Sequence, residues 1–441
     1  MNQLPTPTRR SFLAASGAAL AGVTGASAAT PFRRPRVAAV YTVCTHRSHA
    51  NVILENFLES YPFNGKQTDP GVDLVSLYSD QQPAGDMTPS IVKGYGIPHY
   101  DTIREALCCG GDKLAVDAVL SIGEHGSYPR NELGQVQYPR KRFWDAIVAV
   151  MKDSDRFVPV FNDKHLSFDW DEAKAMYQQS QELGIPLLAG SSVPLAQRRP
   201  ELELPVGSEF SEAVSIHGGP VESYDFHGLE VLQSIVEARR GHETGLASVE
   251  FLSGADVWKA ADEGRWSEEL AQSAIAREYG RAIDIRKALP GEGVVEPHCL
   301  LLNYRDGLQA TVLKLGASSK RWNVACRLKR SAKIHSTAYY VGPWNNRNLF
   351  KALSHAIQQT FIQQKAVYPS ERTLFVTGVL EASMRSRKAK QVIETPHLDL
   401  SYAARDFSAM REMGASWKIV TEDVPEPQTE FSPWGTAKVP E

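Results

Sequence analysis

The chain has 441 residues, of which 42% are hydrophobic, and a formal net charge of −3. The 48 basic residues nearly balance the 51 acidic ones, so no overall field attracts nucleic acid or an anionic membrane. Five cysteines are too few and too irregularly spaced for a disulfide framework or a zinc site. A metal held by Glu124 and His125 with His217 or His227 is an alternative, but their spacing has no diagnostic pattern, and we expect no metal.

The first 28 residues are typical of a twin-arginine export signal. Arg9 and Arg10 precede a weakly apolar run rich in alanine and glycine, and Ala26-Ser27-Ala28 offers a cleavage site. An ordinary secretory signal is the alternative. The run is too short and too rich in glycine for a membrane span. The sequence therefore predicts export to the periplasm or another extracytoplasmic space, with no membrane insertion once the signal is removed.

Residues 36–195 alternate between strand-like and helix-like segments. Apolar strands are expected at "RVAAVYTV", "GVDLVSLYSD", "AVDAVLSIG", "RFVPVFND" and "IPLLAGSS". Amphipathic helices lie between them, and the last has Asp169 and Glu172 at capping-box spacing. Continuous apolar strands that alternate with helices predict a doubly wound parallel sheet, as in a Rossmann-like α/β domain.

Residues 196–420 predict an α+β domain. Strand-like segments occur at 243–254, 297–316 and 322–341, and the middle one has a turn at Arg305-Asp306-Gly307. We expect a mainly antiparallel open sheet, covered by helices at 348–364 and 370–387. Residues 421–441 are rich in proline and are expected to form a tail.

Four segments in this order resemble the glucose-fructose oxidoreductase / inositol dehydrogenase (Gfo/Idh/MocA) family. They are "KGYGIPHYDTIREAL", "AVDAVLSIGEHGSYP", "PVFNDKHLSFDWDEAKAMYQQSQELGIPLLAG" and "GGPVESYDFHGLEVLQSIV". The resemblance implies NAD or NADP as cofactor, a sugar-like small-molecule substrate and a homo-oligomer built through the second domain. It places Lys164 on the lysine of the family's Glu-Lys-Pro motif and His227 on its catalytic histidine.

The chain departs from this family at three places. The three glycines of the first turn are replaced by Tyr41, Val43 and His46. Glycine there lets backbone amides approach the pyrophosphate, and side chains would obstruct that approach. The motif proline is His165, and the family's aspartate is Ser223. We therefore expect no dinucleotide to bind in the standard Rossmann manner.

Four residues are candidates for catalysis. Lys164 follows an expected parallel strand, where such sheets bind ligands, and His227 can accept a hydroxyl proton. Glu124 and His125 lie in a polar loop behind another buried strand, where they suit acid–base or ligand-binding roles. The alternatives are a solvated loop lysine and a structural helix histidine.

The candidates for cofactor binding lie at the ends of the first two expected strands. Asp80 is at the position of the Rossmann acidic residue that binds the adenosine ribose, although a strand-end turn residue is the alternative. Side chains of the first turn offer phosphate donors and positive charge beside a helix N-terminus. These residues are Thr42, Thr45, His46, Arg47 and Ser48.

The sequence thus predicts an exported oxidoreductase that acts on a sugar, polyol or sugar derivative with a retained nicotinamide cofactor. The alternatives are a redox-neutral lyase, hydrolase or epimerase of keto-sugars, which needs no cofactor, and a non-catalytic sugar-binding protein. No nucleic-acid partner is expected.

Overall fold

The computed structural model describes residues 33–428 and 430–440. The export signal predicted for residues 1–28 lies outside the described residues. Residues 34–441 form one compact unit. Within the described part, no helix combines the length and apolar character needed to cross a membrane.

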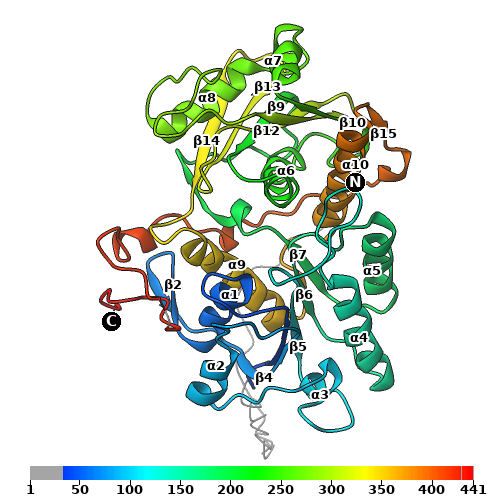
Figure 1. Cartoon of the computed structure of the whole chain (residues 1–441), viewed down its shortest axis with the longest axis vertical. Coiled ribbons are helices and arrows are strands. Elements are labelled where there is room, and N and C mark those ends of the chain that lie inside the picture. The colour runs from blue at the N-terminus through cyan, green and yellow to red at the C-terminus, as the bar shows by residue number, and fades with distance from the viewer. Residues whose placement is uncertain (1–32, 429, 441) are drawn as a thin grey trace, which may run out of the picture. The chain divides into compact units, whose positions relative to one another are not determined.

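The first half of the chain forms a five-stranded parallel sheet in the order β4-β1-β5-β6-β7 (Figure 1). The strands are β1 (Arg36–Tyr41), β4 (Asp73–Ser79), β5 (Ala118–Ile122), β6 (Val160–Asp163) and β7 (Leu187–Gly190). The helices are α1 (His49–Leu58), α2 (Thr88–Tyr95), α3 (Ile103–Cys108), α4 (Arg140–Asp153) and α5 (Trp170–Glu182). All strand pairs are parallel, which confirms the predicted α/β class. A hairpin of β2 (Tyr61–Phe63) and β3 (Lys66–Thr68) was not expected from the sequence.

Helix starts in this half follow the capping residues of the sequence. The Asp169 side chain accepts a hydrogen bond from the backbone N–H of Glu172, as the spacing predicts. Thr102 and Glu105 form a complete capping box at α3. Ser48 caps α1 by accepting from the N–H of Asn51. These caps fix where each helix leaves the edge of the sheet.

The second sheet has eight strands in the order β15-β10-β11-β12-β9-β13-β14-β8. Its strands are β8 (Gln197–Arg199), β9 (Phe210–His217), β10 (Leu246–Ser253), β11 (His298–Tyr304), β12 (Gln309–Lys314), β13 (Trp322–Leu328), β14 (Ile334–Tyr340) and β15 (Ile393–Glu394). Among the described strands only the β9–β12 pair of this sheet is parallel. The mainly antiparallel second sheet is thereby confirmed.

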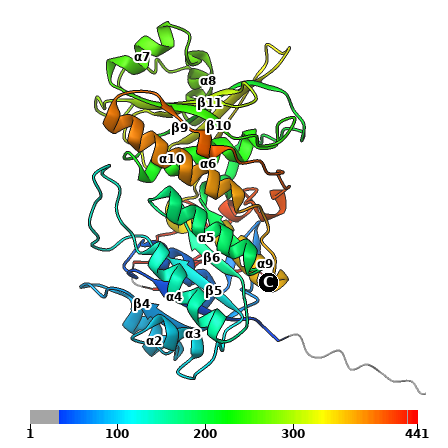
Figure 2. The same cartoon turned by 90° about the vertical axis from the view of Figure 1, so that its right-hand side faces the viewer.

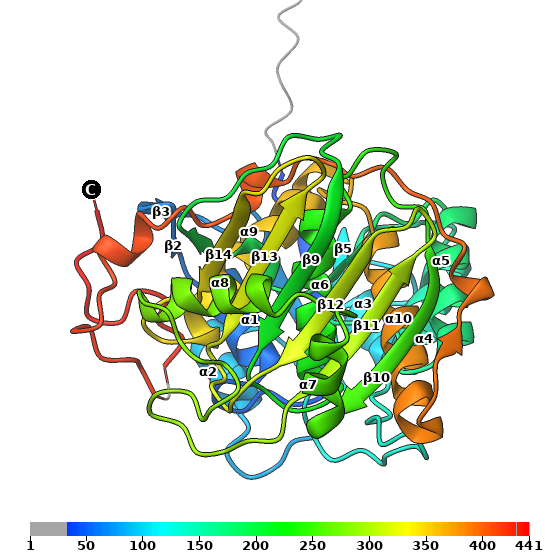
Figure 3. The ribbon, with the colours of Figure 1, turned by 90° about the horizontal axis from the view of Figure 1, so that it is seen from above.

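Helices cover both faces of this second sheet. Helices α6 (Ser223–Val236) and α10 (Glu371–Ala389) lie between the two sheets (Figures 1 and 2). Helices α7 (Ala255–Asp262) and α8 (Glu268–Tyr279) lie across the outer face (Figure 3). Strand residues that point outward pack against these two helices in one apolar cluster. The homo-oligomer stays a prediction.

Helix α9 (Asn346–Gln363) corrects one expectation. It was expected to cover the second sheet, but it packs on α1 of the first half (Figure 1). At this contact lies a buried charge cluster, in which Glu55 of α1 meets Arg347 at 2.7 Å and Lys351 at 3.4 Å.

The C-terminal segment continues the contact between α9 and the first half. This segment has short 3-10 turns at η2 (Pro396–Leu398), η3 (Ser408–Met410) and η4 (Ser416–Lys418), and a further one, η1 (Val193–Leu195), follows β7. The tail expected for residues 421–441 is not free, because Val420 and Trp434 bury their side chains against Trp344.

Candidate functional site

Polar side chains gather where the parallel strands of the first sheet end. Glu124 follows β5, Lys164 follows β6 and Ser191 follows β7. All three are buried. Helix α6, which carries His227, lies over this edge (Figure 1). Carboxyl ends of parallel strands are where open α/β sheets bind ligands.

Glu124 is held between two cations. One carboxylate oxygen lies 3.0 Å from Lys164 Nζ, and the other accepts a hydrogen bond from Arg140 at 2.5 Å. Burial alone would raise the pKa of Glu124, but the two cations hold this pKa well below its usual range. Arg140 fits because Gly123 has no side chain, since a Cβ there would lie 2.7 Å from Arg140 Cγ. The site therefore contains a permanently ionised carboxylate.

Lys164 joins the sheet edge to α6. Its backbone has a φ of 62°, a strained conformation for a side chain of this kind. Its ammonium group donates a hydrogen bond to the carbonyl oxygen of Ser223 at 3.5 Å, one turn before His227. The structure therefore brings Lys164, Glu124 and α6 together, as the resemblance implies. It also places Lys164 in a buried position rather than in a solvated loop.

His227 has an orienting partner that the sequence did not reveal. Its Nδ1 lies 2.6 Å from Ser191 Oγ. Burial, reinforced by the charge of Lys164, holds the pKa of His227 well below its ordinary value, so the ring is neutral. Ser223, which stands where the family has aspartate, bonds Lys164 through its backbone only. Ser191 also follows a parallel strand, but nothing in the sequence indicates that its side chain pairs with His227.

A second histidine pair lies beside this group. His49 Nδ1 lies 2.6 Å from the carboxylate of Asp163, and its ring is 5.0 Å from the ring of His125. The backbone N–H of His49 donates to His125 Nδ1 at 3.4 Å. Neither His49 nor Asp163 was among the predicted site residues. Both belong to the buried polar group.

The neighbouring His165 was not among the predicted site residues. Its Nε2 lies 3.3 Å from Glu222, and Arg140 lies within 3.3 Å of its ring. The motif proline of the family is therefore replaced by a residue that ties the loop after β6 to the start of α6.

The pH dependence of stability offers a test of the His125 environment. Burial, the first cause, and the nearby His49 lower the pKa of His125 from 6.5 to about 4. The unfolded chain therefore binds a proton between these pH values that the folded chain does not. We expect the free energy of unfolding to fall by about 2–3 kcal/mol, relative to His125→Asn, as the pH drops from 6.5 to 4. Urea titrations at several pH values measure this difference, and a constant difference would contradict it.

The first turn has little free backbone for a pyrophosphate. Hydrogen bonds inside the protein already use the amides of Thr42, Cys44, Arg47, Ser48, His49 and Asn51. The standard mode needs such amides free and unobstructed. Tyr41 and Val43, at two of the glycine positions, are both buried in the core. The residues present do not fit a dinucleotide held in the standard Rossmann manner.

The side chains expected to replace those amides are also engaged. Thr42 Oγ1 donates to the Glu124 carbonyl oxygen at 2.5 Å, and Ser48 caps α1. Arg47 forms a bidentate ion pair with Glu426 of the C-terminal segment, and His46 Nε2 lies 3.9 Å from the same carboxylate. Thr45 is the exception, because it is its backbone carbonyl oxygen, not its side chain, that accepts from the N–H of Ser48. The positive charge of this turn is thus paired with Glu426 of the C-terminal segment.

Asp80 lies where the sequence predicts, directly after β4. Its carboxylate accepts from both Tyr78 and Tyr128, at 2.8 and 2.7 Å, and from Arg142 at 2.7 Å. Each oxygen already has two donors. A ribose could bind Asp80 only by displacing one of these donors.

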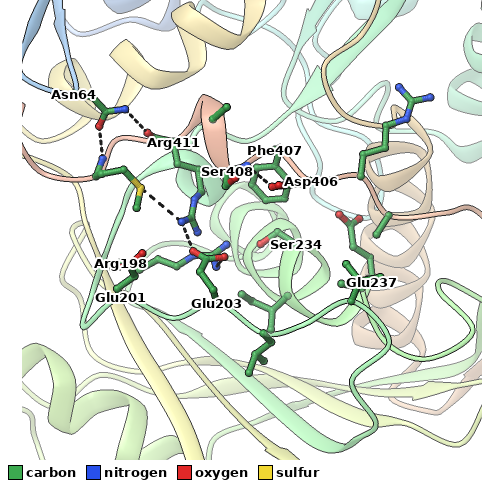
Figure 4. Close-up of a pocket in the computed structure, with 18 residues that line it drawn as sticks. Asn64, Arg198, Glu201, Glu203, Ser234, Glu237, Asp406, Phe407, Ser408 and Arg411 are labelled. Atoms are coloured by element: carbon green, nitrogen blue, oxygen red, sulfur yellow. Dashed lines mark hydrogen bonds and ion pairs between the residues drawn. The ribbon is translucent and has the colours of Figure 1, made fainter. Parts of the chain in front are cut away.

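A pocket of about 670 Å³ lies elsewhere, between the segment after β8, the end of α6 and residues 404–413 (Figure 4). None of the predicted site residues lines it. Arg411 and Arg198 in its wall both pair with Glu203. The pocket is therefore separate from the site at the sheet edge.

Comparisons with known proteins identify the fold. No protein-family model matches the chain, and no curated protein sequence matches it. The solved structure of GenD2 from gentamicin A biosynthesis, in complex with NAD, matches with a TM-score of 0.52 and 13% identity over 82% of this chain and 96% of that one. A myo-inositol dehydrogenase from Corynebacterium glutamicum matches with a TM-score of 0.51 and 11% identity over 82% and 99%. An apo scyllo-inositol dehydrogenase from Lactobacillus casei matches with a TM-score of 0.50 and 10% identity over 82% of this chain and 99% of that one. At this identity the likeness shows the fold, which is the one that the sequence resemblance implies.

Proposed function

We propose that this protein is a divergent relative of the Gfo/Idh/MocA family that catalyses redox-neutral proton chemistry on a keto-sugar or a similar polyhydroxylated molecule. The observation that carries this proposal is the buried Lys164–Glu124 ion pair, 3.0 Å long, against the helix that bears His227. A buried cation and a neutral imidazole on one sheet edge are the groups that proton abstraction next to a carbonyl requires.

Each group has a distinct task in this reaction. With Nδ1–H donating to Ser191 Oγ, the Nε2 of His227 has a lone pair that accepts the proton from the carbon next to the carbonyl. The electron pair of that C–H bond moves to the carbonyl oxygen, where the ammonium of Lys164 stabilises the enolate. Glu124 holds Lys164 in position through their ion pair. Return of the proton from His227 to the same face exchanges this hydrogen with solvent. In an elimination, the enolate electrons re-form the carbonyl and a double bond as a hydroxyl leaves the next carbon, takes the proton from His227 and departs as water.

A nicotinamide-dependent oxidoreductase is the second candidate. It is favoured by the fold, which the protein shares with GenD2 solved in complex with NAD and with an inositol dehydrogenase. The hydrogen bonds of the first turn argue against it. Both candidates use a sugar-like substrate and the same lysine and histidine, so the presence or absence of a bound nucleotide separates them.

A nucleotide titration is therefore expected to be negative. NAD or NADP added up to about 1 mM should give no saturable binding signal by calorimetry, because the amides of the first turn are already bonded inside the protein. No signal at this concentration means that the binding free energy is smaller than about 4 kcal/mol in magnitude. Mass spectrometry of small molecules released from denatured, freshly purified protein should likewise detect neither nucleotide. Micromolar binding that persists in Arg47→Ala would mean that backbone amides still hold the pyrophosphate.

Proton exchange tests the chemistry itself. The protein is incubated in D₂O with a panel of keto-sugars, and ¹H NMR follows the hydrogen on the carbon next to each carbonyl. We expect this signal to disappear for at least one compound without any change in redox state. Binding of a sugar without exchange, elimination or epimerisation would instead support a non-catalytic binding protein.

We also propose that the protein works outside the cytoplasm after twin-arginine export. The paired Arg9 and Arg10 and the small residues at 26–28 support this. Replacing both arginines by lysine should retain the protein in the cytoplasm of a host with this pathway, as measured by cell fractionation. Unchanged export would favour an ordinary secretory signal.

A further inference from the structure

A second polar cluster lies under α6, on the inner face of the second sheet. His217 is the last residue of β9, His298 is the first residue of β11, and Asp225 lies in the first turn of α6. All three side chains are at most 5% exposed. The proposed reaction uses none of them.

The donor atoms of the three residues converge on one point. Asp225 Oδ1 lies 2.9 Å from Nε2 of His217 and 2.7 Å from Nε2 of His298. One potential ligand atom from each residue lies within 4.8 Å of the other two. The register explains this meeting, since both His217 and His298 pair with Lys314 of β12, which lies between their strands.

The surroundings hold each side chain in this orientation. The backbone N–H of Glu222 donates to the other Asp225 oxygen at 2.7 Å, which leaves Oδ1 to face the histidines. The ring of Phe251 stacks on His298 at 5.0 Å. His217 lies against Gly228, where a Cβ would be 3.1 Å from its ring. Such support fixes the rotamers of metal-ligating side chains.

We propose that His217, Asp225 and His298 bind a divalent transition-metal ion, with Zn²⁺ as the best fit. Two imidazoles and one carboxylate match the nitrogen and oxygen ligands of zinc sites. Mg²⁺ and Ca²⁺ prefer all-oxygen ligands and are disfavoured by this set. The sequence does not reveal this set of ligands, because Asp225 and His298 lie 73 positions apart and the three residues form no spacing motif.

The proposed ion has room for further ligands. His298 borders a pocket of about 630 Å³, which is also lined by Pro220, Glu296 and Lys314. The ammonium of Lys314 donates to the Glu296 carbonyl oxygen at 2.9 Å. Water or a small anion in the pocket can therefore complete the coordination of an ion that has three protein ligands.

This metal site is separate from the proton-transfer site. The rings of Tyr224 and Trp322 stack at 5.0 Å. Both rings lie between His217 of the metal site and His227 of the proton-transfer site. The ring centroid of Trp322 is 6.2 Å from that of His217 and 5.4 Å from that of His227, and the centroid of Tyr224 is 6.3 and 6.0 Å from the same two. An aromatic layer thus connects the two sites, and the metal proposal does not depend on the proposed function.

The test uses the full chain after treatment with a chelator. Calorimetric titration with Zn²⁺ should show one site per chain with micromolar or tighter affinity. His298→Ala should weaken binding at least about 100-fold, in line with the loss of one of three ligands. The matched control His335→Ala, on the same sheet, should bind like the natural chain. Equal binding by both variants would overturn the proposal, as would the lack of any stoichiometric site.

A measurement on the natural chain covers the case in which His298→Ala fails to fold. Bound Co²⁺ should give visible absorption bands typical of nitrogen and oxygen ligands, and X-ray absorption of the zinc form should show two imidazoles. A spectrum with oxygen ligands alone would mean that the ion binds elsewhere. The three residues would then form a hydrogen-bonded cluster in which both histidines donate to Asp225.

Discussion

Replacing Glu55 by alanine is expected to lower the free energy of unfolding by about 3–5 kcal/mol. Glu55 is completely buried in α1, and its carboxylate forms ion pairs with two buried cations, Arg347 and Lys351. Removing the carboxylate leaves both charges without compensation in a site that excludes water. Buried cations without a partner are far more costly than the loss of an exposed ion pair.

The same change is expected to loosen the C-terminal segment. Besides Glu55, the guanidinium of Arg347 bonds the carbonyl oxygens of Pro427 and Glu430. Without Glu55, Arg347 loses the partner that fixes its orientation toward this segment. Hydrogen exchange of residues 420–428 should therefore become faster in Glu55→Ala than in the natural chain.

Urea unfolding followed by circular dichroism measures the main effect. The control is Glu182→Ala, because Glu182 lies exposed at the end of α5, where substitutions change stability by about 0.5 kcal/mol or less. Similar values for the two variants would show that Glu55 does not hold α9 on α1.

The helix pairing behind this prediction marks what the sequence could not provide. The parallel sheet was predictable because its strands are mainly apolar and alternate with helices, and the capping residues of α5 marked the start of that helix. Nothing in "NLFKALSHAIQQTFIQQ" shows whether its apolar face meets the second sheet or α1. That choice depends on the ion pairs of Glu55, whose residues lie about 290 positions apart.

The site divides in the same way. Glu124 and Lys164 were predictable because they follow buried strands, and strand ends of a parallel sheet meet at one edge. Ser191, Asp163 and the partners of Asp225 were not, because side-chain pairs between distant segments follow no local period. The hydrogen bonds that fill the first turn also depend on such pairs, above all the Arg47–Glu426 contact with the C-terminal segment.

The occupied turn changes what the fold can do. In a dinucleotide-binding protein, free amides at this turn hold the pyrophosphate. Here those amides bond Asn51, Asp86 and His125 side chains, and the space beside His49 holds Phe350 of α9 at 4.5 Å between ring centroids. The scaffold therefore keeps its strand-end site while its cofactor cradle is filled by the protein.

Replacing Lys164 by methionine is expected to reduce the exchange or turnover rate of a keto-sugar by at least about 100-fold. Removing one donor to a developing oxyanion typically has an effect of this size. Methionine keeps the length and the unbranched stem of lysine, and neither residue is glycine, so the strain at a φ of 62° is retained. Glu124 keeps Arg140 as a partner, so the fold should survive.

The rate loss must be separated from a stability loss and from charge effects elsewhere. Lys152→Met, at the exposed end of α4, serves as the matched control and should retain full activity. Lys164→Arg keeps the charge but cannot place a single ammonium between Glu124 and Ser223. We therefore expect this variant to be as stable as the natural chain and to show a rate between those of Lys164→Met and the natural chain. The expected loss should be in kcat, because an enolate forms only during the reaction. A Lys164→Met variant with unchanged kcat would place the chemistry at another group of this protein.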